Sequence, residues 1–307
     1  MNGGRKATFF CYNWRMQIPV KTLKSGFTLP VYGLGTWGMG GWQEADASED
    51  EKWLAAIHSA LDHGITHLDT AELYGHGHAE ELIGQVVKDY DRSKLLIASK
   101  VLAGMQDGYD GVMRAAHASA ERLGTEIDLY MLHRYPAEGI EEIMRAVNQL
   151  LDEGTIKHIG VSNMTIPRMQ KVQSLTDAPI VCNQLEYSLR MREADRYGVV
   201  EYCQNNDVFV TAWGPLDRAA LEQGGILHEM AAKYAKTPYQ VALNWLIAQP
   251  NVVTIPKTSS TEHLEENLGA LGWELELADF ERLTKEFPNQ VDRSDRVSLD
   301  YAADVAP

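Results

Sequence analysis

The chain has few cysteines and no long apolar run, and both absences narrow its class. Its 307 residues include three cysteines, Cys11, Cys182 and Cys203. These are too few and too scattered for a disulfide framework or a cysteine-based metal site. No apolar segment reaches the roughly 20 residues that a membrane-spanning helix needs. We therefore expect reduced thiols, no membrane partner and a cytoplasmic protein.

Positive charge is also scarce. The chain has 28 lysines and arginines against 43 aspartates and glutamates, which gives a formal net charge of −15. A nucleic-acid-binding surface needs a basic face, so this balance predicts no nucleic-acid partner. The acidity does not identify a small-molecule partner, because its main effect is on solubility.

The first residues differ from the rest of the chain. The short apolar run at 7–12 is interrupted by Asn13 and has no small-residue cleavage site, so a signal peptide is not expected. A regular pattern begins at Met16 and contains no linker, repeat or low-complexity tract. We predict a flexible N-terminal extension at 1–15 and a single domain at 16–307.

Short apolar segments alternate with amphipathic ones after a β-hairpin predicted at 20–29. Strands are expected at 31–35, 65–69, 95–100, 127–133, 156–162, 180–186, 208–213 and 252–256. Helices are expected at 49–63, 112–123, 141–153, 166–175, 199–205, 238–248, 263–271 and 278–286. This pattern predicts an α/β fold, a (β/α)8 TIM barrel with an N-terminal β-hairpin and a C-terminal extra helix plus tail.

Four polar residues lie at the ends of the second, third and fourth predicted strands: Asp69, Tyr74, Lys100 and His133. Each alone has a structural explanation, but α/β barrels place their catalytic groups at these strand ends. Tyrosine, with an ordinary pKa of about 10, is a poor acid at neutral pH, and Lys100 would lower that pKa. Asp69 would orient the lysine, and His133 would hydrogen-bond the same substrate oxygen. The set predicts a proton donor for a carbonyl oxygen.

This set supplies no reducing equivalent, so a cofactor is needed. Ser162, Asn163 and Gln184 offer partners for a carboxamide, and Trp213 offers a flat face for an aromatic ring. The segment 255–260 joins a lysine and hydroxyls to a helix N-terminus, which predicts a phosphate site. The alternative for this segment is a capped helix beside a solvated lysine.

The sequence Gly33-Leu34-Gly35-Thr36-Trp37-Gly38 formally satisfies the dinucleotide fingerprint GxGxxG. That fingerprint requires a helix that begins inside the motif, where its amides can meet the pyrophosphate. Here residues 39–43 continue as a loop, and the next helix is expected near Ser48. The context favours a strand end followed by a loop at the barrel's end.

Four segments resemble motifs of the aldo-keto reductase family: 33–37, 69–75, 161–163 and 255–259. The similarity extends in order from about Val20 to Phe287, and the chain resembles the prokaryotic branch of diketogluconate and methylglyoxal reductases. The resemblance implies reduction of aldehydes or ketones to alcohols by hydride transfer from NADPH (NADP), with NADH possible. Tyr74 would be the general acid, supported by Asp69, Lys100 and His133.

The same resemblance assigns binding residues. The expected cofactor contacts are Gly35, Thr36, Trp37, Ser162, Asn163, Gln184, Trp213, Pro215, Leu216, Lys257, Thr258, Ser259, Ser260, His263, Glu266 and Asn267. The expected substrate contacts are Trp37, Trp42, Arg134 and Tyr135, together with the loop at 101–108 and the tail after Phe287. The partner is a small-molecule carbonyl compound, and a monomer is expected.

Four positions depart from the family pattern. Trp213-Gly214 replaces a common tyrosine-serine pair, and Arg134 stands where tryptophan often follows the histidine. His263 stands where an arginine is common in the adenosine-phosphate site. Because arginine is the better bidentate phosphate partner, His263 weakens the expected preference for NADPH.

Arginines near the expected site suggest a charge preference for the substrate. Arg134, Arg190 and Arg192 would form a cationic rim on an acidic protein and attract carboxylate-bearing carbonyl compounds. The alternative is that these arginines are solvated or pair with nearby carboxylates, for which the candidates are Glu186, Glu193 and Asp195.

Two other functions stay open at this point. One is a nicotinamide-binding regulatory or adaptor subunit with little turnover. The other is a non-redox barrel enzyme, which would leave the nicotinamide site without purpose. His76, His78 and Glu80 suggest a metal, but no further ligands with zinc-like spacing accompany them, so no metal is expected.

Overall fold

A parallel sheet forms the centre of the computed structural model, which describes residues 17–42, 44–216 and 225–299. The predicted extension at 1–15 lies outside these ranges. The eight strands of the sheet lie in chain order from β3 to β10. They are β3 Leu34–Gly35, β4 His67–Asp69, β5 Leu96–Val101, β6 Ile127–Leu132, β7 Ile156–Ser162, β8 Ile180–Glu186, β9 Phe209–Trp213 and β10 Val252–Thr254.

The first and last strands of this order meet and close the sheet. Tyr32 forms a parallel bridge with Thr254, and the Gly33 amide donates a hydrogen bond to the Thr254 carbonyl at 2.8 Å. A Cβ on Gly35 would lie 2.5 Å from the Ile255 carbonyl oxygen, so this close approach requires glycine. The predicted (β/α)8 barrel is confirmed.

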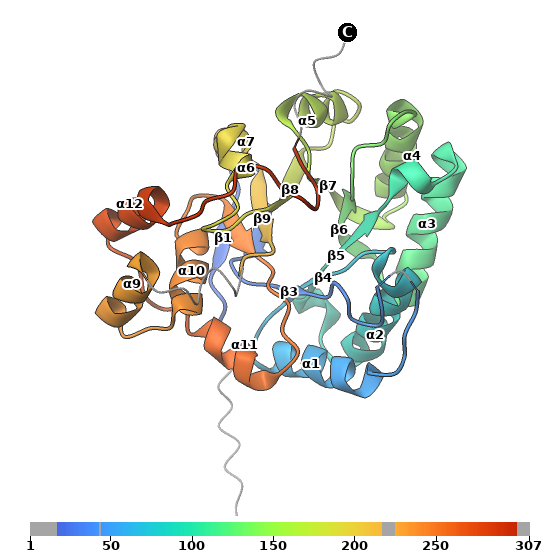
Figure 1. Cartoon of the computed structure of the whole chain (residues 1–307). Helices are drawn as coiled ribbons and strands as arrows, with labels where there is room; N and C mark the ends of the chain where they lie inside the picture. The colour runs from blue at the N-terminus through green and yellow to red at the C-terminus, as the bar shows by residue number, and fades with distance from the viewer. Residues whose placement is uncertain (1–16, 43, 217–224, 300–307) are drawn as a thin grey trace, which may run out of the picture.

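Helices surround the barrel (Figure 1). They are α1 Asp50–Asp62, α2 His78–Val86, α3 Gly108–Leu123, α4 Ile140–Asp152, α5 Ile166–Gln173, α6 Glu193–Arg196, α7 Val199–Asn205, α9 Ile226–Tyr234, α10 Pro238–Ile247, α11 Thr261–Leu268 and α12 Leu277–Glu286. Short 3₁₀ turns occur at η1 Tyr74–Gly77, η2 Val87–Asp89, η3 Arg92–Lys94 and η4 Ala103–Met105.

Local sequence explains where these helices begin and which face they bury. In α4, buried Ile140, Ile143, Met144 and Val147 follow helical spacing and face the sheet. The start of α10 is a capping box in which the Thr237 side chain accepts from the backbone amide of the third helical residue. That start was predicted from Thr237-Pro238, because proline fits the first turn of a helix.

Helix α2 was not predicted from the sequence. It begins after Gly75 and His76, which adopt left-handed backbone conformations with φ of 57° and 53°, and after Gly77 with φ of 93°. These residues predict a loop, so the sequence does not indicate where the helix begins. The signal that was available is the apolar set inside it, in which Leu82 and Ile83 are buried.

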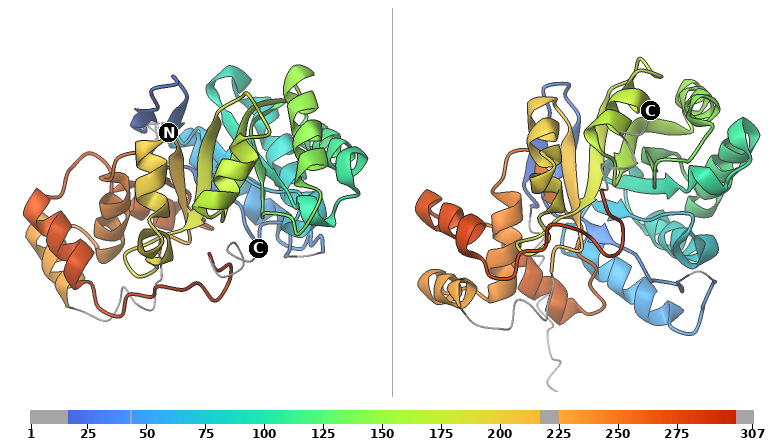
Figure 2. Two further views of the ribbon diagram at one scale, coloured as in Figure 1. Left: turned by 90° about the horizontal axis from the view of Figure 1, so that it is seen from above. Right: turned by 45° about the horizontal axis from the view of Figure 1, so that its top comes forward.

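The hairpin and the C-terminal tail lie at opposite ends of the barrel, as the left view of Figure 2 shows. Strands β1 Val20–Thr22 and β2 Thr28–Pro30 pair in antiparallel fashion, which confirms the predicted hairpin. The tail at 287–299 crosses the end where the parallel strands finish. No helix in the described ranges is long and apolar enough to cross a bilayer.

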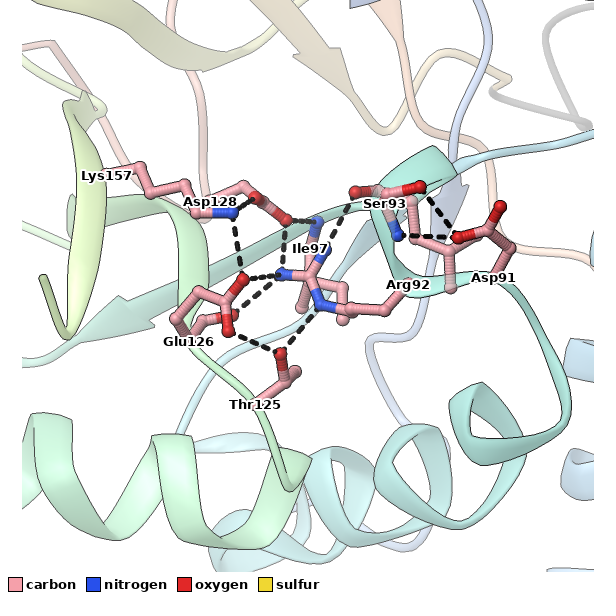
Figure 3. A network of polar contacts seen from close by, with 9 residues as sticks. Asp91, Arg92, Ser93, Ile97, Thr125, Glu126, Asp128 and Lys157 are labelled. Carbon is pink, nitrogen blue, oxygen red and sulfur yellow. Dashed lines mark hydrogen bonds and ion pairs between the residues drawn. The ribbon is translucent and has the colours of Figure 1, made fainter.

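Charged side chains at the end of the barrel near the hairpin form hydrogen bonds and ion pairs with one another (Figure 3). Asp128 accepts hydrogen bonds from Arg92 at 2.6 Å, from Lys157 at 2.9 Å and from the Ile97 amide at 2.9 Å. Lys157 also lies 2.9 Å from Glu126. This network ties the starts of β5, β6 and β7 together, which is a structural role.

Candidate active site

A cleft of about 530 Å³ opens at the C-terminal ends of the strands. Most of the predicted site residues line it. Those are Gly35, Trp37, Asp69, Tyr74, His133, Arg134, Ser162, Asn163, Gln184, Trp213, Pro215, Leu216, Lys257 and Asn267. The strands of the closed barrel therefore bring together residues from most of the length of the chain.

A buried ion pair lies beneath the cleft. Lys100, at 0% side-chain exposure, places its Nζ 2.7 Å from Asp69 Oδ1. The same nitrogen donates to the Thr70 carbonyl at 2.8 Å and to Tyr74 Oη at 3.3 Å. An ammonium has three hydrogens, so these three acceptors fix its position and aim one donor at the phenol.

Tyr74 titrates differently from the expectation. Burial raises the pKa of the phenol, the charge on Lys100 lowers it, Asp69 raises it again, and the net direction is upward. Lys100 lowers this pKa as expected, through its charge and its hydrogen bond, but burial outweighs both effects. The raised pKa keeps Tyr74 protonated at neutral pH, which is the form that a proton donor requires.

Lys100 remains charged despite its burial. Burial alone would lower the pKa of this ammonium, but attraction to Asp69 and Tyr74 and the hydrogen bonds to them shift it upward overall. A protonated Lys100 next to the phenol is therefore the state that the geometry stabilises.

His133 lies edge-on to Tyr74, with ring centroids 5.9 Å apart and planes at 78°. Burial, together with the charges on Lys100 and Arg134, lowers the pKa of His133 to about 3. The ring is therefore neutral at ordinary pH. Its buried Nδ1 has no hydrogen-bond partner within the part of the chain that the structure describes.

Gln184 connects the acid residues to the other half of the cleft. Its Nε2 donates to Asp69 Oδ2 at 2.7 Å, a contact that the sequence did not reveal. Gln184 was predicted to hold a nicotinamide carboxamide. The hydrogen bond to Asp69 uses the side-chain nitrogen of Gln184 but not its Oε1. The acceptor oxygen is the atom left for a carboxamide N–H.

Ser162, Asn163 and Trp213 form one hydrogen-bonded row. Trp213 Nε1 donates to Asn163 Oδ1 at 3.1 Å, and Asn163 Nδ2 donates to Ser162 Oγ at 2.9 Å. Asn163 adopts a left-handed conformation with φ of 54°, which asparagine tolerates better than most residues. The row fixes the indole, which lines the cleft from the end of β9.

The predicted phosphate segment follows β10. Lys257 Nζ lies 5.3 Å from the ring centroid of Trp53 and 5.9 Å from that of Trp42, and it forms no ion pair with a described residue. Burial and the charge on Lys52 lower its pKa. Ser260 caps α11, because its hydroxyl accepts from the His263 amide at 3.3 Å. The segment is thus a capped helix start beside a cation that lacks an anionic partner.

Some predicted residues lie outside the cleft lining: Thr36, Trp42, Tyr135, Thr258, Ser259, Ser260, His263 and Glu266. Trp42 packs edge-on against Trp37 with centroids 4.6 Å apart, so it supports that wall indirectly. Tyr135 packs against the Arg168 guanidinium at 5.2 Å. As predicted substrate contacts, Trp42 and Tyr135 are therefore displaced from the lining.

The expected arginine rim differs from the structure. Arg190 and Arg192 do not line the cleft, and Arg192 Nε instead lies 2.5 Å from Asp195. For Arg192, the structure therefore shows the alternative, a pair with a nearby carboxylate. Arg296 and Val297 of the tail line the cleft instead. The sequence had indicated the tail after Phe287, but no local pattern singled out Arg296.

Of the three residues that suggested a metal, His78 and Glu80 form hydrogen bonds or ion pairs with different residues. His78 contacts Asp50 and Glu81, whereas Glu80 contacts Arg122 and Ser99. No group of three or more potential ligands gathers among the described residues.

Comparison with known proteins agrees with this geometry. The model of the aldo/keto reductase family matches residues 32–286. Methylglyoxal reductase YeaE of Escherichia coli (strain K12) is 32% identical over 280 residues, which cover 89% of this chain and 96% of the relative. Glyoxal reductase of Bacillus subtilis (strain 168) is 30% identical over 264 residues, which cover 85% of this chain and 90% of the relative.

Solved structures show the same relationship. The thermostable aldo-keto reductase Tm1743 is 38% identical with a TM-score of 0.81, over 87% of this chain and 98% of that one. An aldo-keto reductase from Klebsiella pneumoniae, solved with NADPH, is 32% identical with a TM-score of 0.81, over 93% and 100%. With its strand-end residues gathered in one cleft and similarity along most of its length, this chain belongs to the aldo/keto reductase family.

Proposed function

We propose that this protein reduces aldehydes or ketones to alcohols, taking a hydride from NADPH and a proton from Tyr74. The observation that carries the proposal is the position of Lys100, whose buried ammonium contacts both Asp69 at 2.7 Å and Tyr74 at 3.3 Å. The relatives described above as methylglyoxal and glyoxal reductases support the reaction class. The NADPH-bound Klebsiella structure supports the cofactor.

The residues present fit NADPH. Ser162, Asn163 and Gln184 would offer amide and hydroxyl groups to the carboxamide, and Trp213 would offer its face to the nicotinamide ring. Lys257, without an anionic partner among the described residues, would meet the adenosine phosphate. When bound, the cofactor supplies the hydride that none of these side chains can provide.

The proton transfer follows from the buried array. Tyr74 gives its phenolic proton to the carbonyl oxygen as negative charge develops there, and the phenolate that remains lies beside Lys100. Because the ammonium is already in place, its attraction for the new charge needs no reorganisation. Asp69 keeps Lys100 charged and directed at the phenol.

His133 contributes a neutral hydrogen-bonding group. With a pKa of about 3, its ring has one N–H to donate, and it does not compete with Tyr74 as a charged acid. It would orient the carbonyl oxygen while Tyr74 protonates it. A regulatory subunit with little turnover is not favoured, because the proton-donating array is complete.

The direct test mixes the purified protein with NADPH and a panel of aldehydes and ketones and follows the loss of NADPH absorbance. We expect steady oxidation of NADPH that depends on the carbonyl compound, with formation of the matching alcohol. Tight NADPH binding without turnover across a chemically diverse panel would instead favour the regulatory role.

A further inference from the structure

We propose that the carbonyl substrate carries a carboxylate, and that Arg134 and Arg296 recognise it. The proposal rests on the proposed function and adds the substrate class. It differs from the sequence-based expectation of an arginine rim, since only Arg134 of those three arginines lines the cleft and the second guanidinium comes from the tail.

The charges that line the cleft are unevenly distributed. The ionisable acids and bases among the lining residues, apart from His133 and Tyr74, are Asp69, Arg134, Lys257 and Arg296. Asp69 is already bonded to Lys100 and Gln184. The cleft therefore has an excess of positive charge on a chain whose formal net charge is −15. Such a local reversal of sign attracts anions into a cleft.

Lys257 does not account for this excess alone. It lies beside Trp42 and Trp53, on the side where the adenosine phosphate would bind. Arg134 instead follows His133, whose ring lies against the proton donor Tyr74. The charge of Arg134 reaches the reaction centre, because it contributes to the lowered pKa of His133.

Arg134 is available to a ligand. The residue is exposed, and it forms no ion pair or hydrogen bond with another described residue. A guanidinium next to the proton-donating array and lacking an internal anion is unlike Arg192 or Arg122, which bind Asp195 and Glu80. Its availability points to an anion that arrives with the substrate.

Arg296 is held in place by the tail. Buried Glu193 accepts from the Ser294 amide and the Leu299 amide, each at 3.0 Å, on both sides of this arginine. Arg296 itself lies 3.5 Å from Glu186 through one nitrogen, NH1. Because a guanidinium has five N–H donors, most of them stay available for a second carboxylate.

The rest of the lining includes apolar side chains that suit a carbon chain. Trp37, Leu73 and Val297 add apolar surface to the same cleft. Arginine binds a planar carboxylate through two parallel hydrogen bonds, and apolar walls accommodate the methylene groups between carboxylate and carbonyl. The substrate class is an oxo acid. A phosphate-bearing aldehyde is also an anion, so the experiment must distinguish it from an oxo acid.

The experiment compares 4-oxobutanoate with its methyl ester, which is of similar size but uncharged. Variants are Arg134→Met, Arg296→Met and Arg114→Met, the last an exposed arginine on α3 as a matched control. The measured quantity is the ratio of kcat/KM for the acid to kcat/KM for the ester. Loss of a charge-assisted hydrogen bond predicts that this ratio falls about 10- to 100-fold in Arg134→Met.

We expect a fall of several-fold in Arg296→Met, partial recovery in Arg134→Lys, and the wild-type ratio in Arg114→Met. The affinity for NADPH, measured by fluorescence titration, should stay the same in Arg134→Met and Arg296→Met. Thermal unfolding of each variant checks that it is folded.

Three results would overturn the proposal. The first is a ratio in Arg134→Met and Arg296→Met equal to that of Arg114→Met. The second is loss of NADPH affinity in Arg296→Met, which would assign that arginine to the cofactor. The third is a clear wild-type preference for glyceraldehyde 3-phosphate over 4-oxobutanoate. Reduction of the ester with no preference for the acid would reject only this inference, whereas reduction of neither would reject the proposed function too.

Discussion

Gln184 on β8 donates a hydrogen bond to Asp69 on β4, over 2.7 Å and from the opposite side of the barrel sheet. The other carboxylate oxygen of Asp69 accepts from Lys100. The residue expected to hold the nicotinamide therefore also orients the carboxylate behind the proton donor. Cofactor binding and proton donation share one buried group.

Replacement of Gln184 should affect both stability and rate. Gln184→Met leaves Asp69 Oδ2 buried without its donor, which costs about 1–3 kcal/mol of unfolding free energy. We also expect a lower kcat, because Lys100 would be less firmly aimed at Tyr74. Urea unfolding and steady-state kinetics measure the two effects. The control is Gln204→Met, whose side chain makes an exposed bond to the Pro250 carbonyl. Equal effects in the two variants would contradict the assignment.

Removal of the Tyr74 hydroxyl should abolish most of the reduction. Tyr74→Phe is expected to lower kcat by about 10²–10⁴-fold, since that is the usual contribution of general acid catalysis. NADPH affinity should change little, because the phenol contacts Lys100 rather than the residues expected to hold the cofactor. Tyr109→Phe, on a tyrosine that packs against Arg145, is the matched control. Near-native turnover in Tyr74→Phe would exclude it as the proton donor.

The buried ion pair predicts a large stability effect. Lys100→Met leaves Asp69, at 3% side-chain exposure, as an uncompensated charge, which costs about 3–5 kcal/mol. Asp69→Asn in the same chain removes that charge, so the double variant should be more stable than Lys100→Met alone. Chemical denaturation of wild type, both single variants and the double variant forms the test. A double variant less stable than Lys100→Met would show that the charge is not the cause.

Cofactor preference tests the phosphate segment. Lys257 should favour NADPH over NADH, because its ammonium has no anionic partner among the described residues. His263 lies in the first turn of α11, so His263→Arg should strengthen NADPH binding through a charge-assisted hydrogen bond to the 2′-phosphate. Fluorescence titration with both cofactors measures this. Tighter binding of NADH to the wild type would refute the preference.

His78 predicts a pH dependence of stability. Burial lowers its pKa, but hydrogen bonds to Glu81 and Asp50 outweigh burial, and the net direction is upward. Asp46 on the preceding loop is the other carboxylate near it. A raised folded-state pKa means that the stabilisation is fully present below the ordinary value of about 6.5 and disappears as pH rises through the folded value.

The corresponding measurement compares the thermal midpoints of wild type and His78→Gln across that range. The difference between the two midpoints should be largest at acidic pH and shrink as pH rises. His117→Gln is the control, because its ring is more exposed and meets one carboxylate, Glu153. A difference that grows with pH would show the opposite linkage.

Sequence patterns predicted the fold well where hydrophobic periodicity decides it. The bounds of β7 and β8 match the prediction, because each strand begins at a buried isoleucine and most of its residues are buried. Helix α2 was missed because the left-handed turn at Gly75 and His76 conceals its start. Local patterns describe a residue's neighbours in the chain, and such turns depend on contacts made elsewhere.

The sequence predicted which residues form the site but not how they contact one another. Strand ends placed Asp69, Tyr74 and Lys100 on one face, yet the bond from Gln184 links residues 115 positions apart. The lowering effect of Lys100 on the Tyr74 pKa was predicted, but the net upward direction was not, because it depends on the degree of burial, which the sequence does not provide. Assembly as a monomer stays a prediction.

Different residues of the tail hold it on the barrel and line the cleft. Ser294 and Leu299 bind Glu193 through backbone amides, and the hydroxyls of Ser298 and Ser294 bind Glu193 and Glu186. Arg296 and Val297 lie between these anchor points and face the cleft. Substitutions at 296 and 297 can therefore exchange one wall of the cleft while the barrel and the proton-donating residues stay as they are. Substrate range in this protein can diverge, or be engineered, through a segment of a few residues.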